Sequence, residues 1–234
     1  MARAIAIGGV ALGTRPRIVA AGGEGEIEAL AAATDADVVE LRADLFASPV
    51  PETIVAALKR LRGAGRPVIL TVRLAAEGGR ALLDEQRLAI YRAGLPHADA
   101  IDVEIASGAL VADLVPRARA AGVTVILSAH DTAATPPAEA LLALVERGVA
   151  LGADVVKLAA YANTLDDVRT MLRVTLAARE RGVVTMAMGP AGSLSRLFYP
   201  AAGSLLTYAS VGEPTAPGQI PLRELAALLT RFYP

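Results

Sequence analysis

Short runs of β-branched and aliphatic residues alternate along the chain with longer segments rich in alanine and leucine, in which apolar positions recur at helical spacing. The short runs predict eight strands, at Arg17–Ala21, Asp37–Leu41, Pro67–Val72, Ala100–Glu104, Thr124–Ser128, Asp154–Leu158, Val183–Met188 and Ser204–Tyr208. Regular alternation of strands and helices is typical of the strand–helix units that build a parallel sheet.

Helices are predicted between these strands, and glycine or proline follows several of their ends. The predicted helices are Glu24–Ala33, Pro51–Arg62, Asp84–Gly94, Gly108–Ala120, Pro137–Arg147, Leu165–Arg181 and Leu222–Phe232, with a shorter one after Gly192. Glycine past a helix end readily takes the left-handed conformation that stops the helix, and a following proline prevents its continuation. The segment from Gly63 to Pro67 contains both signals.

These elements predict a single α/β domain over residues 1–234 with the fold of a closed (β/α)8 TIM barrel. The structural alternative is an open doubly wound sheet. Two motifs typical of that fold are missing. No predicted strand is followed by G-x-G-x-x-G, since the nearest candidate, Gly22 to Gly25, has a different spacing, and the sequence has no P-loop. The apolar segment from Arg3 to Leu12 is Gly-rich and lacks the cleavage region of a secretory signal. We therefore predict a β-hairpin there, and a cytoplasmic location.

Composition excludes several classes of protein. Of the residues 54% are hydrophobic, yet the longest stretch without a charge, Leu197 to Gly212, is shorter than the roughly 20 residues of a membrane-spanning helix. A net charge of -1 and 3% aromatic residues argue against a nucleic-acid partner. The chain has no cysteine and two histidines, so neither a thiol nucleophile nor a histidine- or cysteine-based metal site is expected.

Polar residues near the ends of buried strands are the candidates for chemistry, because barrel active sites form at the carboxyl ends of the strands. Glu40 and Arg42 share one face of the second strand, Arg73 ends the third, and Glu77 follows it. For Glu40 and Arg42 alone, a structural ion pair explains the pattern as well as a functional role does. The structural explanation weakens as such residues recur at the same end of successive strands.

Lys157 is the strongest candidate. Of 23 basic residues only Lys59 and Lys157 are lysines, and Lys157 lies in an apolar strand. Burial disfavours a charged amine, and a neutral lysine amine can attack a carbonyl to form a Schiff base, which arginine cannot do. His130 follows the preceding strand, where an imidazole can accept and return a proton. His97 precedes a strand, so we expect a structural role for it at the opposite end of the barrel.

The ordered set of motifs resembles one known family over nearly the whole chain. Its pieces are Glu40-Leu41-Arg42-Ala43-Asp44, Thr71-Val72-Arg73 with Glu77-Gly78-Gly79, Asp102-Val103-Glu104, Ser128-Ala129-His130-Asp131, Val156-Lys157, Met188-Gly189 with Ser195-Arg196, and Ala216-Pro217-Gly218-Gln219. Together they resemble the type I 3-dehydroquinate dehydratases of the shikimate pathway. The resemblance implies a (β/α)8 barrel, an N-terminal hairpin covering the barrel bottom, and a homodimer.

The resemblance also implies an activity, the dehydration of 3-dehydroquinate to 3-dehydroshikimate without a metal or cofactor. Lys157 would form an imine with the substrate ketone, His130 would act as general base and acid, and Glu77 would orient His130. The matching substrate-binding residues are Arg196, Thr215 and Gln219 for the carboxylate and Glu40, Arg42 and Arg73 for the ring hydroxyls.

Two alternatives remain open at this point. A class I Schiff-base aldolase on the same barrel would use the same lysine, and Gly189 and Gly192 offer part of the phosphate site it needs. A catalytically inactive barrel that serves as a sensor or scaffold predicts loss of the lysine or the histidine, and both are present.

Overall fold

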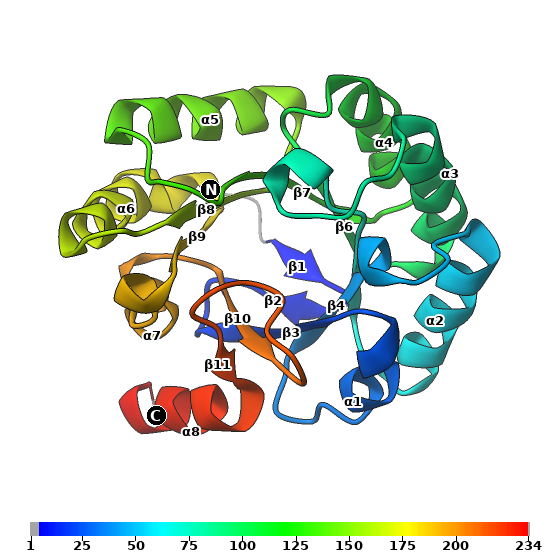
Figure 1. Cartoon of the computed structure of the whole chain (residues 1–234), viewed down its shortest axis with the longest axis horizontal. Coiled ribbons are helices and arrows are strands. Elements are labelled where there is room, and N and C mark those ends of the chain that lie inside the picture. The colour runs from blue at the N-terminus through cyan, green and yellow to red at the C-terminus, as the bar shows by residue number, and fades with distance from the viewer. Residues whose placement is uncertain (1–4, 234) are drawn as a thin grey trace.

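The computed structural model describes residues 5–233, and these contain the predicted alternation of strands and helices (Figure 1). The main sheet is parallel and curls into a barrel. Its strands are β3 (Arg17–Gly22), β4 (Val38–Arg42), β5 (Val68–Thr71), β6 (Ala100–Glu104), β7 (Thr124–Asp131), β8 (Val155–Tyr161), β9 (Val183–Met188), β10 (Leu206–Ser210) and the short β11 (Ile220–Pro221). Successive strands from β3 to β9 pair with one another, and β10 pairs with β3 and with β11. The predicted fold class is confirmed.

Helices surround the sheet on its outside (Figure 1). They are α1 (Ile27–Ala31), α2 (Pro51–Gly63), α3 (Asp84–Gly94), α4 (Gly108–Ala120), α5 (Ala138–Leu151), α6 (Leu165–Ala178), α7 (Ser195–Ala202) and α8 (Leu222–Phe232). The first predicted helix proves to be a 3-10 turn, Glu24–Glu26, followed by α1, and the predicted helix from Leu165 ends in a second such turn, Arg179–Arg181. No helix within residues 5–233 has the length and apolar character needed to cross a bilayer.

A hairpin of β1 (Ala6–Ile7) and β2 (Val10–Ala11) lies at the amino ends of the strands, as predicted. Thr124, the first residue of β7, donates a hydrogen bond to the carbonyl oxygen of Ala6 at 2.6 Å. Ile7 is fully buried among the side chains inside the barrel. Arg3 and Ala4, with which the predicted segment begins, lie outside the described residues.

The barrel interior is apolar toward the amino ends of the strands and polar toward their carboxyl ends. The apolar half is filled by Val19, Val38, Ile69, Ala100, Ile126, Val155 and Val184. Because side chains alternate along a strand, Glu40, Asp102 and Lys157, each two residues beyond one of these, also point inward, nearer the carboxyl ends. The residues between them, such as Val39 and Leu41, belong to the core under the helices. The strand pattern therefore gathers charged side chains at one mouth of the barrel.

The seam between β9 and β10 is less regular than the other strand pairs. A backbone hydrogen bond of 2.9 Å donated by Leu205 joins the two strands at their amino ends. Farther along β9, the amides of Thr185 and Ala187 donate to the hydroxyls of Ser204 and Ser195 at 3.0 and 3.1 Å. Buried amides need a partner, and here side-chain hydroxyls serve in place of a neighbouring strand. The first turn of α7 thereby enters the seam.

Candidate active site

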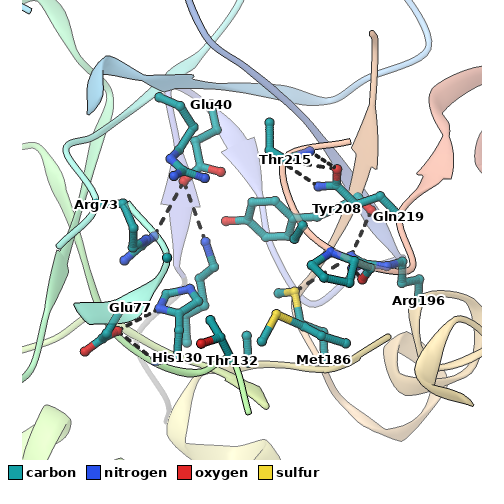
Figure 2. Close-up of a pocket in the computed structure, with 17 residues that line it drawn as sticks. Glu40, Arg73, Glu77, His130, Thr132, Met186, Arg196, Tyr208, Thr215 and Gln219 are labelled. Carbon is teal, nitrogen blue, oxygen red and sulfur yellow. Dashed lines mark hydrogen bonds and ion pairs between the residues drawn. The ribbon is translucent and has the colours of Figure 1, made fainter. Parts of the chain in front are cut away.

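A cavity of about 120 Å³ opens at the carboxyl ends of the strands (Figure 2). All nine residues that the sequence predicted as catalytic or substrate-binding line it: Glu40, Arg42, Arg73, Glu77, His130, Lys157, Arg196, Thr215 and Gln219. They come from strands β4, β7 and β8, from the segments that follow β5 and β10, and from α7. His97 lies in the turn before β6, at the opposite end of the strands, as expected.

Lys157 projects from β8 into the cavity and is 4% exposed. Its Nζ donates a hydrogen bond to Asp102 Oδ2 at 2.8 Å and lies 3.6 Å from Glu40 Oε1. Two carboxylates therefore lie next to this buried amine and hold it in the cavity.

His130 lies near the end of β7, one strand before Lys157, and is bound by Glu77. Glu77 Oε2 is 2.9 Å from His130 Nδ1 and accepts a hydrogen bond of 2.8 Å from the His130 backbone amide. Glu77 ends a 3-10 turn that Gly78 closes with φ of 89°, a left-handed conformation that suits glycine. The glycine after Glu77 thus allows the chain to turn where the carboxylate meets the histidine.

The pKa values of this pair are displaced in opposite directions from their usual ranges. Burial raises the pKa of Glu77 to about 7, and the Glu104 carboxylate adds to this effect. Burial, with the nearby charges of Arg73 and Lys157, lowers the pKa of His130 well below 6.5. A neutral imidazole that donates from Nδ1 to Glu77 leaves Nε2 as the acceptor, the form that a general base requires.

Arg73 is enclosed by carboxylates. Its guanidinium donates to Glu104 at 2.7 Å, to Asp102 at 3.0 Å and to the Ser128 hydroxyl at 2.7 Å, and it lies 4.0 Å from Glu40. Burial alone would lower the pKa of Arg73, but Asp102, Glu104 and Glu40 outweigh burial and raise it. Arg73 therefore compensates buried negative charge in addition to lining the cavity.

Arg42 and Glu40 do not form the ion pair that the sequence allowed. Arg42 instead makes two hydrogen bonds with Asp44, at 2.9 and 2.7 Å, while Glu40 accepts a hydrogen bond from Thr71. The two residues share a strand face but have different partners.

Arg196 is buried without an acidic partner among the described residues. Its guanidinium donates to the carbonyl oxygens of Gly218, Pro217 and Tyr208 at 2.8, 3.2 and 3.2 Å, and it lies 3.8 Å from the Met186 sulfur. Burial lowers the pKa of Arg196 to about 10, so it is still charged at neutral pH. A buried cation that faces a cavity and contacts only neutral groups is suited to bind an anion.

Thr215 and Gln219 belong to the loop between β10 and β11. Gln219 Oε1 accepts a hydrogen bond from the Thr215 amide at 2.7 Å, and Gln219 Nε2 donates to the Thr215 hydroxyl at 3.0 Å. In Figure 2 both lie close to Arg196 on one side of the cavity. The loop is also held to β9, because Gly189 donates its amide hydrogen to Pro217 O at 3.2 Å.

That hydrogen bond bears on the aldolase alternative. The Gly189 amide is bound to Pro217, and the Gly192 amide donates to Gly189 O at 3.1 Å. Neither is free for a phosphate, so the feature that kept this alternative open is lost. Within residues 5–233, no group of three or more histidine, cysteine, aspartate or glutamate side chains is arranged to hold a metal ion.

Sequence reasoning missed two residues of the site. Asp102 belongs to the motif Asp102-Val103-Glu104, from which no role was predicted for it, although it contacts both Lys157 and Arg73. Tyr208 lines the cavity with its ring centroid 4.1 Å from Lys157 Nζ. It ends the eighth predicted strand. Selecting the polar residue at each strand end, the criterion used for the other strands, would have found it.

Groups that can serve as nucleophile, base and anion ligand meet at the mouth where barrel enzymes carry their active sites, which makes this chain a (β/α)8-barrel enzyme. Comparison with known proteins narrows the class. The sequence model of the type I 3-dehydroquinase family matches residues 20–233. The chain belongs to this family.

Individual proteins named as 3-dehydroquinate dehydratases are also similar to this chain. A 3-dehydroquinate dehydratase of Methanosarcina barkeri is 37% identical over 214 residues, which cover 87% of this chain and 88% of the relative. One from Klebsiella pneumoniae is 39% identical over 208 residues, 83% of this chain and 82% of the relative. The crystal structure of the Geobacillus kaustophilus 3-dehydroquinate dehydratase superposes with a TM-score of 0.89 at 31% identity, covering 99% of this chain and 97% of that one.

Similarity to an aldolase extends only to the fold. A deoxyribose phosphate aldolase from Aeropyrum pernix superposes with a TM-score of 0.61 at 18% identity, over 92% of this chain and 89% of the aldolase. At this identity the superposition shows a shared barrel fold.

Proposed function

We propose that this chain, a hydro-lyase of the type I 3-dehydroquinase family, converts 3-dehydroquinate to 3-dehydroshikimate through an imine on Lys157. The observation that carries the proposal is the buried amine of Lys157 in one small cavity with His130, whose ring is bound to Glu77. A cavity of this size suits a compact ligand, and its charged lining suits a polar one.

The reaction balances without an added reagent. The Lys157 amine adds to the C3 ketone, and the adduct loses water to form a protonated imine. The imine acidifies the C2 hydrogen, which His130 removes, and the electron pair moves toward the imine nitrogen. The C1 hydroxyl then leaves with a proton as water. A second water hydrolyses the imine and releases the product, so one water is lost overall.

His130 is the group proposed to move protons. Its depressed pKa keeps the imidazole neutral at pH 7, as a base must be. After it has taken the C2 proton, the resulting imidazolium lies next to Glu77, which stabilises it when ionised. The same imidazolium then donates a proton to the departing hydroxyl.

The substrate-binding roles follow from charge. Arg196 has no acidic partner among the described residues, and we assign it the substrate carboxylate, together with Thr215 and Gln219 from the adjoining loop. Glu40, Arg42 and Arg73 are assigned the ring hydroxyls. Most donors of Arg73 are already bound by carboxylates, so its assigned contribution is mainly to hold Glu40 and Asp102 in place.

Trapping the imine tests the function. Purified protein is mixed with 3-dehydroquinate and borohydride, and the adduct is mapped by mass spectrometry. We expect the added mass on the Lys157 peptide, together with formation of the conjugated enone in the ultraviolet in the absence of borohydride. Lys157→Ala should abolish both. Lys59→Ala removes the other lysine, an exposed residue of α2, and should retain both.

The role of His130 is tested separately. His130→Ala should still trap an adduct but lose nearly all turnover, about 100-fold or more, because general base catalysis typically contributes that much. Normal turnover in this variant would remove His130 from the role of base. Turnover that survives Lys157→Ala would exclude the imine.

We also propose that the chain forms a homodimer through the face of α6, α7 and α8, which lie along one side of the barrel (Figure 1). This face exposes large apolar side chains, at Leu165, Leu194, Phe198 and Phe232. Asp166 and Arg169 beside them carry opposite charges. A face with apolar groups and both signs of charge can match itself about a two-fold axis, which a second copy of this chain provides.

Analytical ultracentrifugation tests the dimer. We expect twice the chain mass for the wild type and the chain mass for Phe198→Glu. Leu83→Glu is the matched control, since Leu83 is also exposed but lies outside this face, and it should stay dimeric. A monomeric wild type, or a dimeric Phe198→Glu variant, would contradict the proposed interface.

We further propose one domain over residues 1–234 and a cytoplasmic location, where cell fractionation should find the protein.

A further inference from the structure

Tyr208 has a buried hydroxyl group that no described residue binds. It lies in β10, is 3% exposed and lines the cavity, and its Oη has no hydrogen-bond partner in the described chain (Figure 2). The other buried tyrosines are different. Tyr91 donates to the Asp102 carbonyl oxygen, and Tyr199 donates to the Val168 carbonyl oxygen at 2.6 Å. Buried tyrosine hydroxyls normally find such partners, so this one calls for an explanation.

Packing explains the ring but not the hydroxyl. The ring face lies 4.1 Å from Lys157 Nζ, a distance at which an aromatic ring attracts a cation. Phenylalanine would supply the same ring without burying an unbound polar atom, which costs stability. The hydroxyl therefore makes no hydrogen bond with the described residues, and because Tyr208 lines the cavity, the geometry indicates a ligand as its partner.

The hydroxyl acts as a donor. Burial, with the negative charges of Glu40 and Asp102, raises the pKa of Tyr208 well above 10, so the proton is retained. The charged groups around the ring are Glu40, Asp102, Arg73 and Lys157, and none is within hydrogen-bond distance of the hydroxyl. An acceptor oxygen must then come from the molecule that occupies the cavity.

We propose that Tyr208 is a substrate-binding residue whose O–H donates a hydrogen bond to an oxygen of the bound polyhydroxylated substrate, close to the carbon attached to Lys157. The inference rests on the proposed function and deepens it, since it adds Tyr208 to the residues assigned to bind the substrate. The ring packs against the Lys157 nitrogen, which carries the imine in the proposed reaction, and the hydroxyl binds the substrate.

The substitution Tyr208→Phe removes the hydroxyl and keeps the ring. We expect KM for 3-dehydroquinate to rise about tenfold, the usual effect of losing one buried hydrogen bond, with kcat within about threefold of the wild type. The matched control is Tyr199→Phe, which removes a buried hydroxyl outside the cavity and should leave KM unchanged.

Thermal unfolding without ligand provides an independent measurement. Tyr199→Phe loses a hydrogen bond within the protein and should unfold at a lower temperature, whereas Tyr208→Phe loses none and should unfold at the wild-type temperature or above it. An unchanged KM in Tyr208→Phe, or a fall in its Tm equal to that of the control, would overturn the inference. Failure of the wild type to turn over 3-dehydroquinate would instead reject the proposed function.

Discussion

At the scale of single residues, the site depends on charges that are buried next to one another. Asp102 is fully buried between Arg73 and Lys157. Burial by itself raises the pKa of this carboxyl, but Arg73 and Lys157 outweigh burial and lower it far below its usual range. Asp102 therefore stays ionised and holds both cations at the floor of the cavity. Glu77 has a different environment, and its raised pKa makes it the carboxylate that titrates near neutrality.

The first prediction concerns this titration. Since the pKa of Glu77 is about 7, lowering the pH through 7 protonates it and removes the negative charge beside His130. We expect kcat/KM of the wild type to fall below pH 7. Glu77→Gln cannot titrate, so its kcat/KM should not fall as the pH drops below 7. It should instead stay about tenfold below the wild-type maximum, since a neutral acceptor stabilises an imidazolium less. If kcat/KM of the Gln variant still fell below pH 7, a group other than Glu77 would be responsible for the fall.

The second prediction concerns Arg196. Arg196→Lys keeps the charge but loses the planar fork that binds a carboxylate through two hydrogen bonds. We expect KM to rise on the order of tenfold to 30-fold with a smaller change in kcat, measured by steady-state kinetics. The same substitution at Arg173, an exposed residue of α6, serves as the control. Equal KM values for the two variants would argue against carboxylate binding by Arg196.

At the scale of elements, the irregular seam between β9 and β10 makes room for part of the site. Ser195 and Ser204 satisfy the backbone of β9, and the chain between them forms α7. Arg196, next to Ser195, can then reach from the start of α7 to the carbonyl oxygens of Tyr208 and Gly218. A complete ladder at this seam would occupy the Tyr208 carbonyl oxygen and exclude the arginine.

The third prediction follows for the loop between β10 and β11. Gly218 has φ of 74°, and a Cβ there would lie 2.5 Å from the carbonyl oxygen of Gly189. Gly218→Ala should therefore displace the loop and the groups it carries, raising KM about tenfold with a small change in Tm. Gly63→Ala, at the end of α2, meets no neighbouring atom and should change neither KM nor kcat. Kinetics identical to the wild type in Gly218→Ala would show that the loop does not shape the site.

At the scale of the whole molecule, the apolar packing inside the barrel and the charged cavity lie at opposite ends of the strands. The hairpin and the apolar interior fill the amino-end half, and the charged side chains occupy the carboxyl-end mouth. Sites for chemistry carry buried charge that does little for stability, while the closed end can pack tightly. Substitutions at the two ends should therefore separate the two properties.

Ile7→Ala is the fourth prediction. Ile7 is fully buried against the barrel interior, and its truncation should lower the free energy of unfolding by about 2 to 4 kcal/mol, seen by urea denaturation. Because the site lies at the other end, kcat/KM at 25 °C should not change. Leu83→Ala, at an exposed position, should cost less than about 0.5 kcal/mol. Both variants should unfold in one cooperative transition, as expected for one domain, and two transitions would contradict it.

Much of the fold and of the candidate site could be predicted from the sequence. Strands buried on both faces produce long apolar runs, and a charged residue in such a run is conspicuous, which is how Lys157 and Glu40 were found. Arg196 and Gln219 came instead from the family resemblance, because an arginine near the start of a helix is common on protein surfaces. Asp102 was overlooked because a carboxylate has no obvious role until its neighbours are known.

The sequence alone determined the alternation of strands and helices, the barrel class and the nine residues that line the cavity, because these depend on local periodicity and on recognisable motifs. Only the tertiary structure decided which charges pair: Arg42 with Asp44, Lys157 with Asp102, and Arg196 with no carboxylate among the described residues. It also decided that the Tyr208 hydroxyl is left without a protein partner. Distances between side chains on different strands depend on how the sheet curls and closes, and that geometry is a property of the assembled barrel.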